Sequence, residues 1–141
     1  MNTFYEILQG VHSYWAYLVL LLVTLTTIIT FIKASKKAEA DPNTKKIGFF
    51  TVMTVHLQLV FGVILYIISP MVIFGAETMK TSELRLYALE HPLMMLLGII
   101  LITIANVKLK KAEKINMTIP ILFLIGLILM LSRIPYEVWF K

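Results

Sequence analysis

Two long segments without a charged residue constrain this chain more than any other feature of its sequence. No Asp, Glu, Lys or Arg occurs from Ile7 to Ile32 or from Ile47 to Ala76. Each segment is longer than the roughly 20 residues that a helix needs to cross the hydrocarbon core of a bilayer. A chain of 141 residues cannot hide both segments in one small soluble core. The sequence therefore predicts a protein that spans a membrane.

The composition agrees with this prediction and narrows the available chemistry. Hydrophobic residues make up 59% of the chain and charged residues only 15%, whereas soluble domains are about half apolar and about a quarter charged. The chain has no cysteine, which excludes disulfides, thiolate metal sites, iron–sulfur clusters and covalent c-type haem attachment. Histidine is therefore the obvious residue for binding a metal cofactor.

Two more apolar segments follow in the second half of the chain. One is uncharged from Pro92 to Val107, and the other runs from Ile115 to Ser132 and continues past Arg133. We expect an all-α membrane protein that forms one domain over residues 1–141, a four-helix bundle running up, down, up and down. The expected helices cover residues 3–34, 42–74, 82–109 and 116–140.

Local signals support two of these boundaries. Asp41 followed by Pro42 is typical of a helix start, with the aspartate as the N-cap and proline in the first turn. Ser69-Pro70 should kink or end the second helix, because proline cannot donate a hydrogen bond to the carbonyl one turn earlier.

The lysines predict how the chain is oriented in the membrane. The connections at residues 33–46 and 108–114 hold five and four lysines, nine of the 13 basic residues. By the positive-inside rule, both connections face the cytoplasm of a bacterial inner membrane and both termini lie outside. The net charge of +5 is then explained by topology and by contact with anionic lipids, and not by a nucleic-acid partner.

Ionisable groups inside membrane helices are costly and mark functional sites. The candidates here are His12, His56, His91, Glu90 and Arg133. At about 1.5 Å per residue, His12 lies about 31 Å from the lysine-rich end of its helix and His91 about 25 Å. On the same scale Arg133 lies about 24 Å along its helix and His56 only about 15 Å. Three polar groups therefore approach the outer leaflet at similar heights.

The positions of His12 and His91 suit the ligation of one haem. In the expected bundle their helices are diagonal neighbours, so the two imidazoles can approach a flat macrocycle from opposite faces. Gly98 and Gly126 are expected to leave room for the ring. Arg133 is expected to neutralise the haem propionates. The predicted cofactor is one haem b per chain, with a second haem or copper left open.

Other roles for these residues stay open. The two histidines could instead form hydrogen bonds without a cofactor, and Arg133 could pair with Glu137 or Glu90. His56 has no settled role, because Gln58, Gly62 and Ser69 gather on the opposite face of its helix. A second cofactor, a haem shared with His91 and a dimer contact are the alternatives for His56, which we keep as a weaker candidate metal ligand.

Four short motifs carry a resemblance to a known group of proteins. They are His12-Ser-Tyr-Trp, the midhelix His56, the segment from Leu86 to Met95, and Arg133-Ile-Pro-Tyr. With these motifs the chain resembles small four-helix bacterial membrane proteins described as cytochrome b-like. More distantly, it is similar to one four-helix half of haem A synthase. The resemblance implies that His12 and His91 are axial ligands, with His56 a third candidate. A full synthase has two such halves, whereas this chain has one.

The leading hypothesis is a b-type cytochrome of the membrane, acting in electron transfer or in haem or oxygen sensing. One alternative is a haem- or quinone-linked oxidoreductase, for which a homodimer would restore two halves. Another is a cofactor-free assembly factor for a respiratory oxidase, a role that requires respiratory-chain partners. The sequence shows no catalytic triad, phosphate-binding loop or carboxylate pair, so we expect neither a hydrolase nor a transferase.

Overall fold

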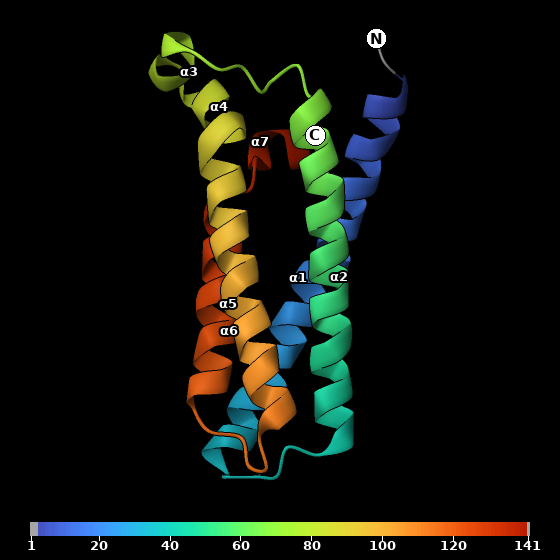
Figure 1. Cartoon of the computed structure of the whole chain (residues 1–141), viewed down its shortest axis with the longest axis vertical. Helices are drawn as coiled ribbons and strands as arrows, with labels where there is room; N and C mark the ends of the chain where they lie inside the picture. Colours follow the sequence, from blue (N-terminus) through green and yellow to red (C-terminus); the bar gives the residue numbers. More distant parts are fainter. Residues whose placement is uncertain (1–2, 141) are drawn as a thin grey trace.

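The structure is a computed structural model that describes residues 3–140, and its secondary structure is helical throughout (Figure 1). These residues contain no strand, and Glu39 and Lys114 form an isolated bridge. The elements are α1 (Thr3–Ser35), α2 (Pro42–Ile68), α3 (Ala76–Lys80), α4 (Ser82–Arg85), the π-helix η1 (Leu86–Glu90), α5 (His91–Lys111), α6 (Thr118–Ser132) and α7 (Tyr136–Trp139).

Three stretches of helix are long and apolar enough to cross a bilayer: α1, α2, and the combined segment Ser82–Lys111. Helix α6 is also apolar but has only 15 residues, which correspond to about 22 Å of helix. Large apolar side chains cover the outside of the long helices, among them Ile28, Phe49 and Ile104. A surface of this kind would promote aggregation in water, and it suits contact with lipid. The prediction of a helical membrane protein is confirmed at this level.

The four longest helices lie side by side (Figure 1). Helix α1 packs against α2 and α6, and α5 also packs against α2 and α6. Helices α1 and α5 are therefore diagonal to each other, which places His12 opposite His91. Both ends of the described chain lie at one end of the bundle, and the two lysine-rich connections lie at the other (Figure 1).

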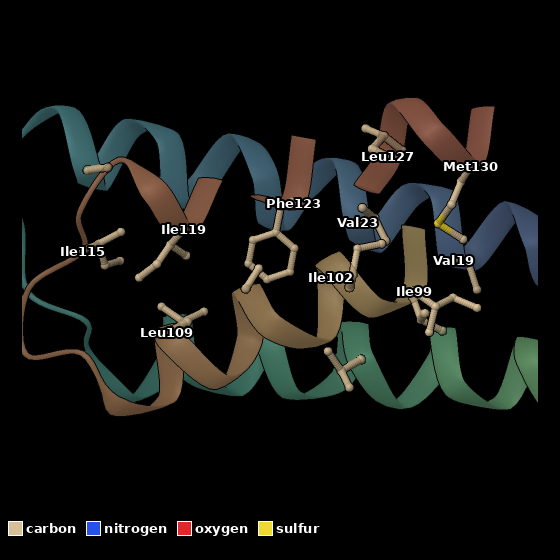
Figure 2. Close-up of a cluster of buried hydrophobic side chains, with 14 of the residues drawn as sticks. Val19, Val23, Ile99, Ile102, Leu109, Ile115, Ile119, Phe123, Leu127 and Met130 are labelled. Carbon is tan, nitrogen blue, oxygen red and sulfur yellow. The ribbon is translucent and has the colours of Figure 1, made fainter. Parts of the chain in front are cut away.

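A continuous apolar core joins the helices between the two histidines and the lysine-rich end of the bundle. Figure 2 shows Val23, Ile102 and Phe123 pointing toward one another between the helices, and all three side chains are fully buried. Two threonines of neighbouring helices, Thr26 and Thr51, add a hydrogen bond of 2.7 Å between their hydroxyls. This packing fixes the relative positions of the helices and therefore of the polar groups that they carry.

The start of α2 follows its sequence signals. Asp41 is the N-cap, its carboxylate accepts a hydrogen bond from the Thr44 amide at 2.7 Å, and Pro42 occupies the first turn. Lys33, near the end of α1, donates to the same carboxylate. The connection between the two helices is therefore held at both of its ends.

Two of the predicted helices are shorter than expected. Helix α2 ends at Ile68 and not at residue 74, because Pro70 cannot continue the hydrogen-bond ladder. The segment expected to be helical over residues 116–140 divides into α6 and α7. The break lies at Arg133, whose φ of −136° and ψ of 34° are not helical, and Pro135 follows it.

Replacement of Asp41 by asparagine tests this connection through its pH dependence. The hydrogen bond from Lys33, followed by those from Thr44, holds the pKa of Asp41 well below its usual value. A carboxylate with a lowered pKa stabilises the fold above the pKa of the unfolded state, about 3.9, and the stabilisation is lost as the pH falls through the folded-state pKa. In thermal unfolding in detergent, Asp41→Asn should lower the midpoint at pH 7, and the difference from wild type should shrink in acid. A difference that is independent of pH would contradict this assignment.

Candidate functional site

A cavity of about 350 Å³ lies in the half of the bundle that holds the chain ends, and its size is within the range of small-molecule sites. It is enclosed by α1, α2, α5 and α6, with α7 alongside them. Its wall is mainly apolar, as in Val19, Leu59 and Ile99. The polar and aromatic residues that line it are Tyr5, Gln9, His12, Ser13, Gln58, Tyr66, Ser69, Tyr87, His91 and Trp139.

The predicted meeting of His12 and His91 is found in this cavity. The centroids of their imidazole rings are 6.4 Å apart, and the ring planes cross at 77°. The two residues come from diagonal helices and are separated in sequence by most of the chain. Among the described residues, no group of three or more His, Cys, Asp or Glu side chains is placed to hold a metal ion. The potential ligand set at this point is therefore an imidazole pair.

The imidazole of His91 is fixed in one orientation. Its Nδ1 lies 2.8 Å from the backbone carbonyl oxygen of Arg133, where α6 ends. A carbonyl can only accept a hydrogen bond, so Nδ1 carries the proton and donates it. In the neutral ring Nε2 is then unprotonated, with its lone pair available. A histidine held through one nitrogen in this way is typical of metal ligands.

The imidazole of His12 has an unsatisfied nitrogen. Its Nδ1 is buried and has no hydrogen-bond partner among the described residues. On one side the ring lies against Gly62 of α2, where an added Cβ would be 3.3 Å from His12 Cε1. The lack of a side chain at Gly62 therefore lets α2 approach the histidine. A buried nitrogen of this kind calls for a partner that the chain itself does not supply.

Glu90 links two arginines beside the imidazole pair. Its carboxylate oxygens lie 2.7 Å from Nε of Arg85 and 3.2 Å from Nε of Arg133. Of the two partners considered for Arg133 from the sequence, the structure selects Glu90. Since Arg133 also receives the His91 hydrogen bond on its carbonyl, the consecutive residues Glu90 and His91 both hold the end of α6.

A π-helix precedes His91 and has a clear local cause. Pro92 has no N–H to donate to the carbonyl of Ala88, one turn earlier. The hydroxyl of Tyr66 on α2 donates to that carbonyl at 2.8 Å. The His91 amide bonds to Leu86, five residues back, as expected for the wider turn of η1. Single π-turns of this kind are frequent at functional sites.

Replacement of Tyr66 by phenylalanine tests this arrangement. Among the described residues, the substitution removes the side-chain hydrogen bond to the Ala88 carbonyl. We expect a loss of stability of about 1 kcal/mol, because a buried acceptor is left unpaired. The thermal unfolding midpoint in detergent should fall for Tyr66→Phe and stay unchanged for the exposed control Tyr14→Phe. Equal midpoints for Tyr66→Phe and wild type would show that the hydrogen bond does not contribute to stability.

Gly98 and Gly126 were expected to leave room for a bound ring, but they do not line the cavity. They lie against each other where α5 meets α6: a Cβ on Gly98 would be 2.9 Å from the carbonyl oxygen of Gly126, and a Cβ on Gly126 would be 3.0 Å from that of Gly98. The space beside each glycine is taken up by the neighbouring helix. Small residues at such contacts allow helix backbones to approach closely in membranes.

His56 is not brought to the other histidines. Its side chain is exposed on the outside of the bundle, and its Nε2 lies 3.0 Å from the hydroxyl of Thr103. That hydroxyl also donates to the Ile99 carbonyl. The opposite face of α2, with Gln58, Gly62 and Ser69, lines the cavity instead. The sequence left open which face of α2 points into the bundle. In the structure it is the face with Gln58, and His56 points outward.

The short helix α7 lies along the cavity and is fastened to α1. The Trp139 indole donates to the Ser13 carbonyl at 3.2 Å, and its ring stacks on Tyr17 with centroids 4.5 Å apart. Trp139 and Val138 contribute to the cavity wall. The C-terminal residues therefore form part of the enclosure around the imidazole pair.

Two residues of the site were not assigned a role from the sequence. Gln58 was noted only as a member of a polar face, and Tyr66 was not singled out. The proline after His91 signals a carbonyl in need of a donor, but which residue supplies it depends on how α2 and α5 are aligned.

No protein-family model, curated protein or solved structure matches the chain.

Proposed function

We propose that this protein is a membrane b-type cytochrome in which His12 and His91 together hold one haem. The role is electron transfer, or sensing of haem or oxygen. The observation that carries the proposal is the imidazole pair inside a largely apolar cavity between membrane helices.

The distances between the residues fit such a group. With about 2 Å for each metal–nitrogen bond and about 1 Å from a ring nitrogen to the ring centroid, two imidazoles on one ion have centroids about 6 Å apart. The separation of His12 and His91 is 6.4 Å. The unpartnered Nδ1 of His12 also favours a ligand that is not part of the chain. Both observations support the proposal.

The chain's own residues would orient and insulate the cofactor. The Arg133 carbonyl holds His91 in one tautomer, and the largely apolar wall would surround the cofactor with few polar groups. The Arg133 guanidinium is ion-paired with Glu90 and does not line the cavity, so it would supply positive charge to the carboxylates of a porphyrin from the edge of the site. When bound, haem supplies one-electron iron chemistry whose potential is set by axial ligands and burial.

The orientation in the membrane is part of the proposal. The lysine-rich connections would face the cytoplasm of a bacterial inner membrane, with both termini and the cavity near the outer surface. In this arrangement α6, together with the non-helical break and α7, completes the fourth crossing. The proposal includes exchange of electrons with quinones or respiratory-chain proteins.

The haem content of the purified protein tests the proposal. Protein from haem-replete cells should be coloured, give a reduced-minus-oxidised difference spectrum, and contain about one haem per chain in a pyridine haemochrome assay. Iron measured on the same sample should match the haem. A colourless preparation that takes up no added haem would contradict the cytochrome and favour the alternative of a cofactor-free assembly factor.

A further inference from the structure

The side-chain amide of Gln58 is buried in the cavity wall, with 8% of the residue exposed. Its Nε2 donates a hydrogen bond to the backbone carbonyl of His12 at 2.8 Å. A backbone carbonyl accepts hydrogen bonds and never donates them, so the amide end that faces it must be the NH₂ group. The other end, Oε1, is therefore an acceptor.

That acceptor has no partner. Oε1 of Gln58 is buried and unbonded among the described residues. An unpaired polar atom is costly, the more so in a membrane helix with no bulk water around it. Buried polar atoms in folded proteins are otherwise nearly always bonded. A hydrogen-bond donor from outside the chain is missing at this point.

The residues around Gln58 indicate what kind of ligand would carry this donor. The cavity is largely apolar and lies between membrane helices, which suits a lipid-soluble molecule with few polar groups. Aromatic side chains of Tyr66, Tyr87 and Trp139 line it. Flat rings pack well against such side chains. A ring that carries a hydroxyl meets both requirements.

We propose that the cavity binds the ring of a membrane-soluble hydroquinone, with one ring hydroxyl donating a hydrogen bond to Gln58 Oε1. The oxidised quinone has carbonyl oxygens and cannot donate to Oε1. The site therefore prefers the reduced form of the ligand. Gln58 Oε1 is distinct from the histidine nitrogens but lies in the wall of the same cavity, so the hydroquinone would use space that the proposed haem also uses. Its binding does not require the haem, and this inference therefore stands apart from the proposed function.

Titration calorimetry of haem-free protein with a soluble pair of probes tests this inference. We expect tetramethylhydroquinone, kept reduced under anaerobic conditions, to bind at least tenfold more tightly than tetramethylquinone. Gln58→Leu should weaken hydroquinone binding by about tenfold and change quinone binding far less, because it removes the acceptor that only the hydroquinone can use. It also removes the hydrogen bond from Nε2 to the His12 carbonyl, a change that does not distinguish the two probes. Asn106→Leu, which replaces an amide outside the cavity, should bind both probes as wild type does.

Several outcomes would overturn the proposal. Equal affinities for the two probes, or tighter binding of the quinone, would remove Gln58 Oε1 as the acceptor. Binding of neither probe would mean that a water molecule satisfies the amide. If circular dichroism shows that Gln58→Leu does not fold, Gln58→Met replaces it in the test. The comparison of the two probes on the wild-type protein then still decides whether the reduced form is preferred. Since haem-free protein is used, the haem proposal can fail while this one stands, and the reverse.

Discussion

Replacement of either His12 or His91 by alanine should abolish the low-spin haem spectrum, whereas His56→Ala should retain it. The centroids of the two imidazoles lie 6.4 Å apart inside the cavity, so loss of one would leave the iron of the proposed haem with a single protein ligand from this pair. His56 is exposed and bonded to Thr103 on the outside of the bundle. Reduced-minus-oxidised spectra of the three purified variants, normalised to protein, measure this difference.

The variants of the two cavity histidines should still fold. Circular dichroism and size-exclusion chromatography in detergent should match those of wild type, so that loss of the spectrum reports ligation. Added imidazole should restore part of the low-spin spectrum, since it fills the vacated position on the iron. A low-spin spectrum that survives His12→Ala but not His56→Ala would assign the ligand role to His56 and contradict our account.

Adding a methyl group at the contact between Gly98 and Gly126 should cause a large loss of stability. A Cβ on Gly98 would lie 2.9 Å from a backbone carbonyl of α6, and one on Gly126 would lie 2.7 Å from the buried Ile102 side chain. Neither position can relax without separating the helices. We expect Gly98→Ala and Gly126→Ala each to cost about 1–3 kcal/mol, as overpacked cores do.

Gly10→Ala is the matched control for these two variants. Gly10 lies on α1, and an added Cβ there meets nothing within 4 Å. Thermal unfolding in the same detergent should give a midpoint for Gly10→Ala equal to or above that of wild type, because alanine favours helix more than glycine does. If Gly98→Ala were as stable as Gly10→Ala, the close approach of α5 and α6 would be incorrect.

The long helices could be predicted from the sequence because their signals are local. Charge-free segments identify α1 and α2, and Asp41-Pro42 marks the start of α2. Helix ends were less certain. Pro70 ends α2 outright, where the sequence alone allowed either a kink or an end.

The imidazole pair was also predictable, because the heights of the two histidines in the bundle follow from helix geometry. The rise along each helix places His12 and His91 at similar heights, and diagonal packing brings them together. The rotation of each helix about its own axis is harder to obtain, since apolar residues surround every helix in a membrane. For this reason the sequence could not decide whether His56 or Gln58 faces inward.

The contacts between helices could not be predicted residue by residue. A glycine in a membrane helix suits either a bound ring or a neighbouring helix, and Gly98 and Gly126 serve the second purpose. The hydrogen bond from Tyr66 to Ala88 likewise depends on the alignment of α2 and α5. These details arise from packing in three dimensions.

The central claim is that His12 and His91 bind the same haem iron. Pulsed electron paramagnetic resonance on ferric protein labelled with ¹⁵N only in histidine measures how many histidine nitrogens are bound to the iron. Our account predicts a low-spin iron coupled to two histidine rings in wild type and in His56→Ala. Coupling to a single histidine ring, or to none, in a protein that contains haem would contradict it.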